Sequence, residues 1–97
     1  MPSISENPDR AQRLADIVKA IAHPVRLRIV AIIAAEDQRV GSLVERLGTT
    51  QANVSQHLRI LRMSGLVTAV RKNGAARYTL AQPGLKDLIN CLEGCAH

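Results

Sequence analysis

The sequence predicts one mainly α-helical domain, with about five helices and a β-hairpin. Two patterns support this fold class. Apolar residues recur at helical spacing in successive segments that end at proline, glycine or short polar turns. After Gly65 the pattern changes to strict alternation, and Asn73-Gly74 divides the alternating stretch into two strands. A chain of 97 residues, 46% of them hydrophobic, fits a single domain over 1–97 with one core.

The N-terminal part of the chain predicts an arm followed by two helices. Residues 1–8 are polar and contain prolines, so we expect a loose arm. Apolar residues at helical spacing then predict a helix over 9–21. A residue before proline is driven out of the helical region, so His23-Pro24 ends this helix, and Pro24 starts the next, over 24–35. We expect His23 to cap or pack at the junction; the alternative is a proton or metal ligand.

The middle of the chain has the outline of a helix-turn-helix. A polar turn over 36–39 leads into a short helix, SLVERLG, which ends at its glycine. A longer helix follows at once, with Thr49 or Thr50 as its N-cap, and it ends at Gly65. Two helices joined by a glycine-containing turn of a few residues predict a helix-turn-helix over 42–64.

The second of these helices has one apolar side and one polar, basic side. Val54, Leu58 and Leu61 form a stripe that can pack against the core. Gln, Ser and Arg on the other side can hydrogen-bond base edges or phosphates, and the small Ala52 allows close approach to a groove. The alternative is an amphipathic core helix whose polar side only faces water.

The charge distribution favours a polyanionic partner. No acidic residue occurs between Glu45 and Asp87, although an ordinary surface mixes the two signs. The net charge is +5 and the isoelectric point is about 10. With one Tyr and no Phe or Trp, the chain lacks the aromatic platforms of single-strand and RNA binders. The basic residues in the acid-free interval are Arg46, Arg59, Arg62, Arg71, Lys72, Arg77 and Lys86.

The alternating stretch over 67–80 predicts a two-stranded hairpin with a type I′ turn at Asn73-Gly74. Arg71, Lys72 and Arg77 lie near its tip, which suits phosphate contact beside the groove that the helix enters. The alternative is an edge hairpin that its charges keep soluble.

The last predicted helix, over 85–93, carries Leu and Ile on one face and must bury them. Once the central helices pack together, this face and that of the helix over 9–21 remain. We therefore expect the two helices to form a homodimer interface. A two-fold dimer would place its reading helices ~34 Å apart, as a palindromic duplex operator requires.

Several functional classes are disfavoured. No apolar run reaches the ~20 residues of a membrane span, and the N-terminus has no secretion-signal pattern, so we expect a cytoplasmic protein. We do not expect an enzyme. Ser55 and His57 are two apart on one helix and cannot face each other as nucleophile and base, and neither a phosphate-binding glycine loop nor paired carboxylates occur. A winged-helix module that binds an acidic protein remains an alternative.

Three segments, IAHPVRLRIV, QANVSQHLRILRMSGLV and VRKNGAARYTL, resemble the ArsR/SmtB family of bacterial winged helix-turn-helix repressors in order and spacing, over about 16–80. The resemblance implies a homodimer that leaves its operator when an effector binds. It also implies that the helix over 51–62 enters the major groove and the hairpin, or wing, contacts the minor groove or its phosphates. For His57 the alternative is contact with the DNA backbone. The expected DNA-binding residues are Thr50, Gln51, Ser55, Gln56, His57, Arg59, Arg62, Arg71, Lys72 and Arg77.

The effector site differs from known patterns of the family. Members that sense arsenic or cadmium through the third helix have Cys-x-Cys there, and this chain has none. Members that sense zinc through the last helix have spaced Asp, His and Glu or His ligands there, and this helix offers Asp87 but no histidine before His97. Cys91 and Cys95 share a helix face, and with His97 they suit a thiophilic ion such as arsenite, cadmium or zinc. Alternatives are a disulfide or persulfide switch, if the helix frays at Gly94, or a buried Cys91 beside a disordered tail.

Overall fold

Five α-helices and one two-stranded hairpin make up the part of the chain that the computed structural model describes, residues 3–95. This is the predicted fold class. No helix in this part is long and apolar enough to cross a membrane. The elements are a 3-10 turn η1 (Ile4–Glu6), α1 (Pro8–Ile21), α2 (Pro24–Ala35), α3 (Val40–Leu47), α4 (Gln51–Met63), β1 (Val67–Lys72), β2 (Ala75–Leu80) and α5 (Gly84–Cys95).

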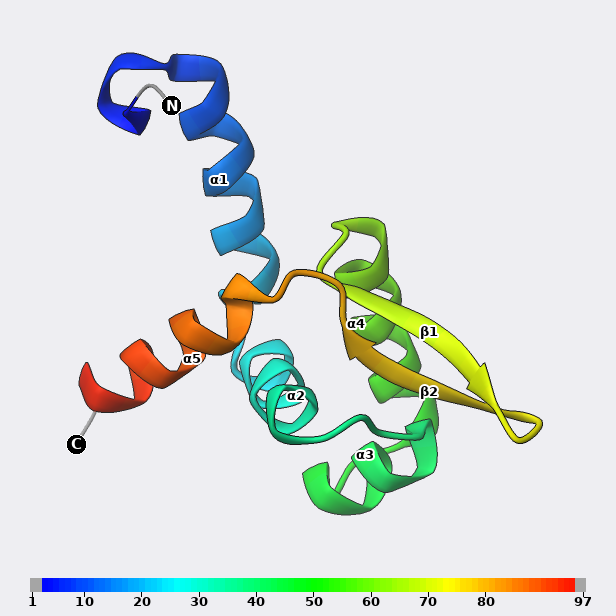
Figure 1. The fold of residues 1–97 in the computed structure, drawn as a ribbon. Coiled ribbons are helices and arrows are strands. Elements are labelled where there is room, and N and C mark those ends of the chain that lie inside the picture. Colours follow the sequence, from blue (N-terminus) through cyan, green and yellow to red (C-terminus); the bar gives the residue numbers. More distant parts are fainter. Residues whose placement is uncertain (1–2, 96–97) are drawn as a thin grey trace.

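Helix α2 lies at the centre of the molecule because it is apolar on nearly every side. Ile29, Val30 and Ile33 are buried, and the helix contacts α1, α3, α4, β2 and α5 (Figure 1). Its first turn is capped by His23, whose Nδ1 accepts a hydrogen bond from the Val25 amide at 3.1 Å. The expectation that His23 caps this junction is confirmed.

Helices α3 and α4 form the helix-turn-helix. Helix α3 begins at Val40, two residues before the predicted start, and ends at Leu47; its C-cap is Gly48, whose φ of 66° is left-handed. Thr50 is the N-cap of α4, since its hydroxyl accepts from the Asn53 amide at 3.1 Å. The chain leaves α4 through Gly65, which also has a positive φ, 75°.

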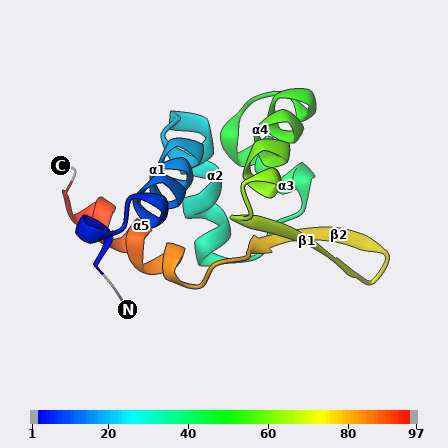
Figure 2. The ribbon, with the colours of Figure 1, turned by 90° about the horizontal axis from the view of Figure 1, so that it is seen from above.

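The hairpin has the predicted turn. Asn73 and Gly74 have φ values of 52° and 78°, as a type I′ turn requires, and the register pairs Val67 with Leu80. The Arg71 guanidinium donates to the Gly74 carbonyl oxygen at 3.1 Å, which ties the side chain to the turn. Figure 2 shows the wing extending away from the helices, next to α3 and α4.

The predicted polar turn over 36–39 contains a β-bridge. The Gln38 amide donates to the Tyr78 carbonyl oxygen at 3.1 Å, and the Tyr78 amide donates back at 2.6 Å. The Gln38 side chain is buried, and its amide nitrogen donates to the Glu36 carbonyl oxygen. The bridge therefore covers the outer edge of β2, and every residue of that strand is half-buried.

The two terminal segments also differ from their predicted bounds. The expected loose arm over 1–8 contains the η1 turn, and Asn7 caps α1 by accepting from the Arg10 amide at 3.0 Å. Residues 1–2 lie outside the described part. Helix α5 runs to Cys95 and not to residue 93.

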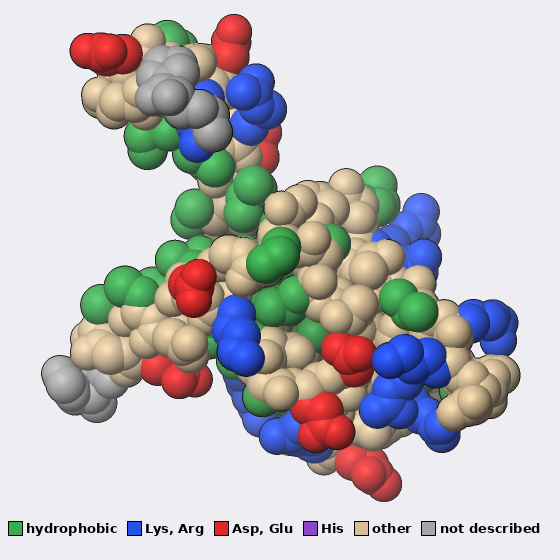
Figure 3. Space-filling model, viewed as in Figure 1, with side chains coloured by type: hydrophobic (Ala, Val, Ile, Leu, Met, Phe, Trp, Pro, Cys, Tyr) green, Lys and Arg blue, Asp and Glu red, His purple; other side chains and the backbone are tan. Residues whose placement is uncertain are grey.

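Helices α1 and α5 project from the body (Figure 1), and the space-filling view shows a notch between them (Figure 3). Hydrophobic side chains line this notch in the space-filling view (Figure 3). Val18 of α1 is 56% exposed and Leu92 of α5 is 39% exposed, although both are apolar. The two predicted dimerisation helices therefore have apolar faces that this chain leaves uncovered.

Candidate nucleic-acid interface

Helix α4 presents its polar side to solvent. Val54, Leu58 and Leu61 are buried behind it against the rest of the core. The helix contacts α1, α2, α3 and β1, which hold it from several directions. Seven consecutive or near-consecutive positions were expected to face DNA here, and six of them are exposed: Thr50, Gln51, Ser55, Gln56, Arg59 and Arg62.

The N-terminus of α4 is fixed by two threonines. The Thr50 hydroxyl caps the backbone, and the Thr49 hydroxyl accepts from the Asn53 side-chain amide at 3.1 Å. Gln51 follows directly, at the first position of the helix. These hydrogen bonds hold the first turn of α4 in place, and so they fix where the side chains of Gln51 and, one turn later, Ser55 project from the helix.

The seventh position, His57, lies on another side of α4. Its half-buried ring is 4.6 Å from the His23 ring, centroid to centroid, with 42° between the planes. Burial lowers the pKa of His57 below its ordinary value of 6.5, and His23 and Arg26 lower the pKa further because they oppose a second positive charge. The His57 Nδ1 is buried and has no hydrogen-bond partner within residues 3–95. The structure thus separates His57 from the six exposed positions.

The wing holds its three cations differently. Arg71 and Lys72 are exposed near the tip. Arg77 is half-buried, and its guanidinium donates to the Asp37 carbonyl oxygen at 3.4 Å. This contact joins the wing to the segment between α2 and α3. Arg77 therefore has a structural role in addition to its charge, which the sequence did not reveal.

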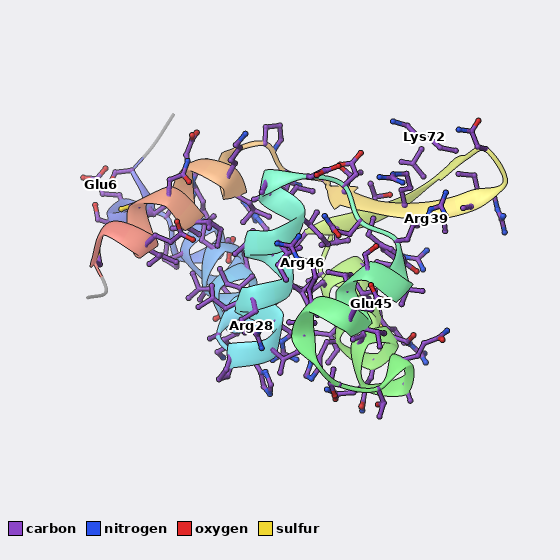
Figure 4. All side chains as sticks on the ribbon, turned by 90° about the horizontal axis from the view of Figure 1, so that it is seen from below. Glu6, Arg28, Arg39, Glu45, Arg46 and Lys72 are labelled. Carbon is purple, nitrogen blue, oxygen red and sulfur yellow. The ribbon has the colours of Figure 1, made fainter. Side chains whose placement is uncertain are left out.

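Close to the wing, acidic groups lie on its α3 side. Lys and Arg gather over the wing and α3 in Figure 3, with Asp and Glu between them. In Figure 4 Arg46 of α3 lies near Arg28 of α2, whose guanidinium donates to the Arg46 carbonyl oxygen at 3.4 Å. The groove on this side is lined by residues of both signs: Glu36, Asp37, Gln38, Arg39, Ser42, Glu45, Arg46 and Arg77.

A second hollow, between the end of α4 and β1, has positive charge only. Its volume is about 380 Å³, and it is lined by Arg59, Arg62, Met63, Val67 and Thr68. Met63 and Thr68 were not among the expected DNA-binding residues. In the sequence, the one indication of their role is position: Met63 follows Arg62, and Thr68 lies at the start of β1. Only the packing of β1 against α4 brings the two residues together.

The two cysteines lie on one flank of α5, four residues apart, and both are exposed free thiols. Cys91 is therefore not a core residue of this chain. Helix α5 continues through Gly94, so it does not fray there. Residues 3–95 contain no group of three His, Cys, Asp or Glu side chains that could hold a metal ion, and His97 lies outside them.

Comparisons with known proteins agree with this geometry. A family model described as "Bacterial regulatory protein, arsR family" matches residues 23–69. An uncharacterized HTH-type transcriptional regulator of Mycobacterium tuberculosis is 37% identical over 76 residues, which are 77% of this chain and 67% of that protein. A biofilm growth-associated repressor of Xylella fastidiosa is 35% identical over 83 residues, 86% of this chain and 73% of that protein.

A solved structure has the same fold. The transcriptional repressor BigR from Xylella fastidiosa superimposes with a TM-score of 0.87 and 30% sequence identity. The alignment covers 99% of this chain and 98% of that chain. The arrangement of five helices and a hairpin is thus a winged helix-turn-helix along its whole length.

Proposed function

This chain belongs to the ArsR family of bacterial regulatory proteins, and on this basis we propose that it is a homodimeric transcriptional repressor that binds a palindromic operator in duplex DNA. Helix α4 enters the major groove and the wing contacts the adjacent backbone. A role on chromosomal DNA implies a cytoplasmic location. The relative and the solved structure from Xylella fastidiosa are both named repressors, which favours repression over activation.

The observation that carries the proposal is the outward side of α4. Gln51, Ser55 and Gln56 are exposed hydrogen-bonding side chains on a helix whose other side is locked in the core. Amide and hydroxyl groups at these positions can pair with base edges in a major groove, which is wide enough for a helix. Arg59 and Arg62 add positive charge on the same helix, and Arg71 and Lys72 add it on the wing.

The notch between α1 and α5 supports the dimer. A second copy of the chain would bury Val18, Leu92 and their apolar neighbours, which a monomer leaves in contact with water. A two-fold axis through this notch would present both copies of α4 to one duplex. Both projecting helices would then couple the subunit interface to the spacing of the reading helices.

We place the effector site at the thiols of α5, for a thiophilic metal or metalloid ion such as arsenite, cadmium or zinc. Cys91 and Cys95 are exposed, unpaired and one helical turn apart, so both sulfurs can reach one soft ion. A further ligand would come from His97 or from the other subunit. Ligand binding on α5 would change how the subunits pack and so weaken operator binding.

Thiol oxidation or persulfide formation is the second candidate for the effector. The exposure of both thiols favours it equally. A disulfide between the two would have to unwind the last turn of α5, because the side chains of a regular helix diverge from its axis. Because of this requirement, we rank thiol oxidation below metal binding as the effector signal.

DNA binding is tested by shift assays with a promoter duplex and with its single strands. We expect duplex binding that weakens steeply with salt, because each neutralised phosphate releases counterions. Preference for single strands, or affinity that ignores salt, would contradict the proposal. Capture of an acidic protein without any duplex binding would instead support a protein-interaction module.

The effector is tested by titrating arsenite, cadmium, zinc and a sulfane-sulfur donor into the protein–duplex complex. We expect one of them to release wild-type protein but not Cys91→Ser or Cys95→Ser. Both variants should bind DNA like wild type when no effector is added, which serves as the control. Equal release of all three proteins would exclude the α5 thiols as the sensor.

A further inference from the structure

The hollow between α4 and β1 is lined by two arginines and by no acidic residue. Arg59 and Arg62 are three residues apart on α4, so their side chains emerge on the same side of the helix. Thr68 faces them from β1, and Val67 forms the floor. The hollow is open to solvent, and it adjoins the outward side of α4 that carries Gln56.

The charges in the hollow are uncompensated. Among residues 3–95 the guanidinium groups of Arg59 and Arg62 have no hydrogen-bond or ion-pair partner, and no carboxylate lines the hollow. Two guanidinium groups at this spacing repel each other unless an anion lies between them. Their two full charges outweigh the partial negative charge, about half a unit, at the C-terminal end of α4.

The other residues that line the hollow indicate which class of anion can bind there. The exposed Thr68 hydroxyl can donate a third hydrogen bond to an oxyanion. Met63 is 77% exposed, more than any other large hydrophobic side chain described here, and it stands beside the arginines. A flexible thioether packs well against an apolar ring. Cations, a hydroxyl and an apolar wall together match a phosphate with its attached deoxyribose better than a small inorganic anion.

We propose that this hollow is the seat of one phosphate of the DNA backbone and its adjoining deoxyribose. The proposal rests on the duplex-binding function above and refines it. Arg59 and Arg62 share that phosphate with Thr68, and Met63 packs against the sugar. Arg59 is thus an anchor and not a base reader, and base discrimination rests with Gln51, Ser55 and Gln56.

The first test measures how the affinity depends on salt, for a promoter duplex and a scrambled duplex of equal length. One phosphate contributes about 0.9 to the logarithmic salt slope, so a dimer with two seats loses about two units when both are removed. We expect the Arg59→Ala/Arg62→Ala double variant to lose about two units, and to lose affinity equally on both duplexes. A loss of about four units would mean two separate phosphates per subunit, and would overturn the shared seat.

The other walls give variants that keep the charge. Thr68→Val should weaken both duplexes several-fold through the lost hydroxyl. Met63→Ala should weaken both duplexes, and Met63→Leu should restore binding because it keeps an apolar wall. Arg13→Ala on α1 removes one exposed charge far from the hollow and should leave the slope unchanged. If the Met63→Leu protein binds the duplexes no more tightly than the Met63→Ala protein, the proposed contact between Met63 and the sugar is wrong.

The second test locates the phosphate. Single neutral methylphosphonates are placed along the promoter duplex, and one position in each half-site should weaken wild type but cause no further loss in the double variant. If every substitution weakens both proteins alike, the seat is wrong although duplex binding stands. If wild type binds no duplex, the function itself fails, so the two failures are distinguishable.

Discussion

His57 illustrates how a single residue can change meaning between sequence and structure. In the sequence it sits within the run expected to face DNA. In the structure its ring packs on His23, beside Arg26, at the junction where α1 passes into α2. The residue therefore joins the reading helix to the helix that leads into the proposed dimer interface. Its charge state bears on stability more directly than on base recognition.

The lowered pKa of His57 predicts a pH-dependent stability. The unfolded chain binds a proton near the ordinary pKa of 6.5, whereas the folded protein binds it only at lower pH. Stability is therefore full above about pH 6.5 and falls as the pH drops toward the folded pKa. We expect the melting temperature of His57→Gln to fall less than that of wild type between pH 7.5 and 5.5. Identical falls would show that other groups cause the effect.

Thr50 predicts a stability effect that can be separated from DNA contact. Its hydroxyl accepts from the Asn53 amide, a donor that has no other partner in the first turn of α4. Thr50→Ala should cost about 1 kcal/mol of unfolding free energy, and Thr50→Ser should cost much less. Urea denaturation without DNA measures both. A Ser variant as unstable as the Ala variant would rule out the cap as the cause.

At the scale of elements, the wing and the reading helix depend on one another. Strand β1 packs against α4, the bridge at Gln38 covers the edge of β2, and Arg77 ties the wing to the segment after α2. These contacts fix the angle between wing and helix. A duplex that α4 enters would therefore find the wing cations at a set distance.

Two glycines predict opposite effects of the same substitution. Gly74 has a φ of 78° in the turn, whereas Gly94 lies within α5, and a Cβ at either position would meet no atom within 4 Å. Gly74→Ala should destabilise the protein by roughly 1–2 kcal/mol through backbone strain. Gly94→Ala should stabilise it by roughly 0.5–1 kcal/mol through helix propensity. Chemical denaturation tests both, and effects of the same sign would contradict the assigned conformations.

At the scale of the whole molecule, the exposed notch between α1 and α5 is the feature on which the proposed dimer and its regulation depend. It brings together the apolar faces of the first and last helices, which lie at opposite ends of the chain. Helix α5, which carries both thiols, lies on the opposite side of α2 from the reading helix α4 (Figure 1). An effector on α5 would therefore act on DNA through subunit packing and not through contact with α4.

A charge on the exposed apolar face of α5 should break the dimer. Leu92→Asp puts a carboxylate where a second copy would pack, and its burial would be unfavourable without a partner. We expect sedimentation to give a monomer, and operator affinity to fall by at least tenfold because one half-site binds alone. Val70→Asp, on an exposed wing position, is the control for oligomeric state. A Leu92→Asp protein that remains dimeric would place the interface elsewhere.

The sequence by itself determined the features that depend on near neighbours. The sequence predicted an N-cap at Thr49 or Thr50, and the structure has it at Thr50. The helix start at Pro24, the turn at Asn73-Gly74 and the buried stripe of α4 were also predicted, and the structure has each of them. Backbone geometry and side-chain period act over a few residues, so they can be read directly from residue order.

Only the tertiary structure decided the features that join distant segments. The Gln38–Tyr78 bridge, the His23–His57 contact, the inward turn of Arg77 and the hollow beside Thr68 each pair residues from different elements. Helical period predicts which side of α4 is buried, but not which neighbour covers each flank. The neighbours of each flank are set by how the other elements pack around α2. Burial of the apolar surface of α2 contributes more free energy than any single polar contact can.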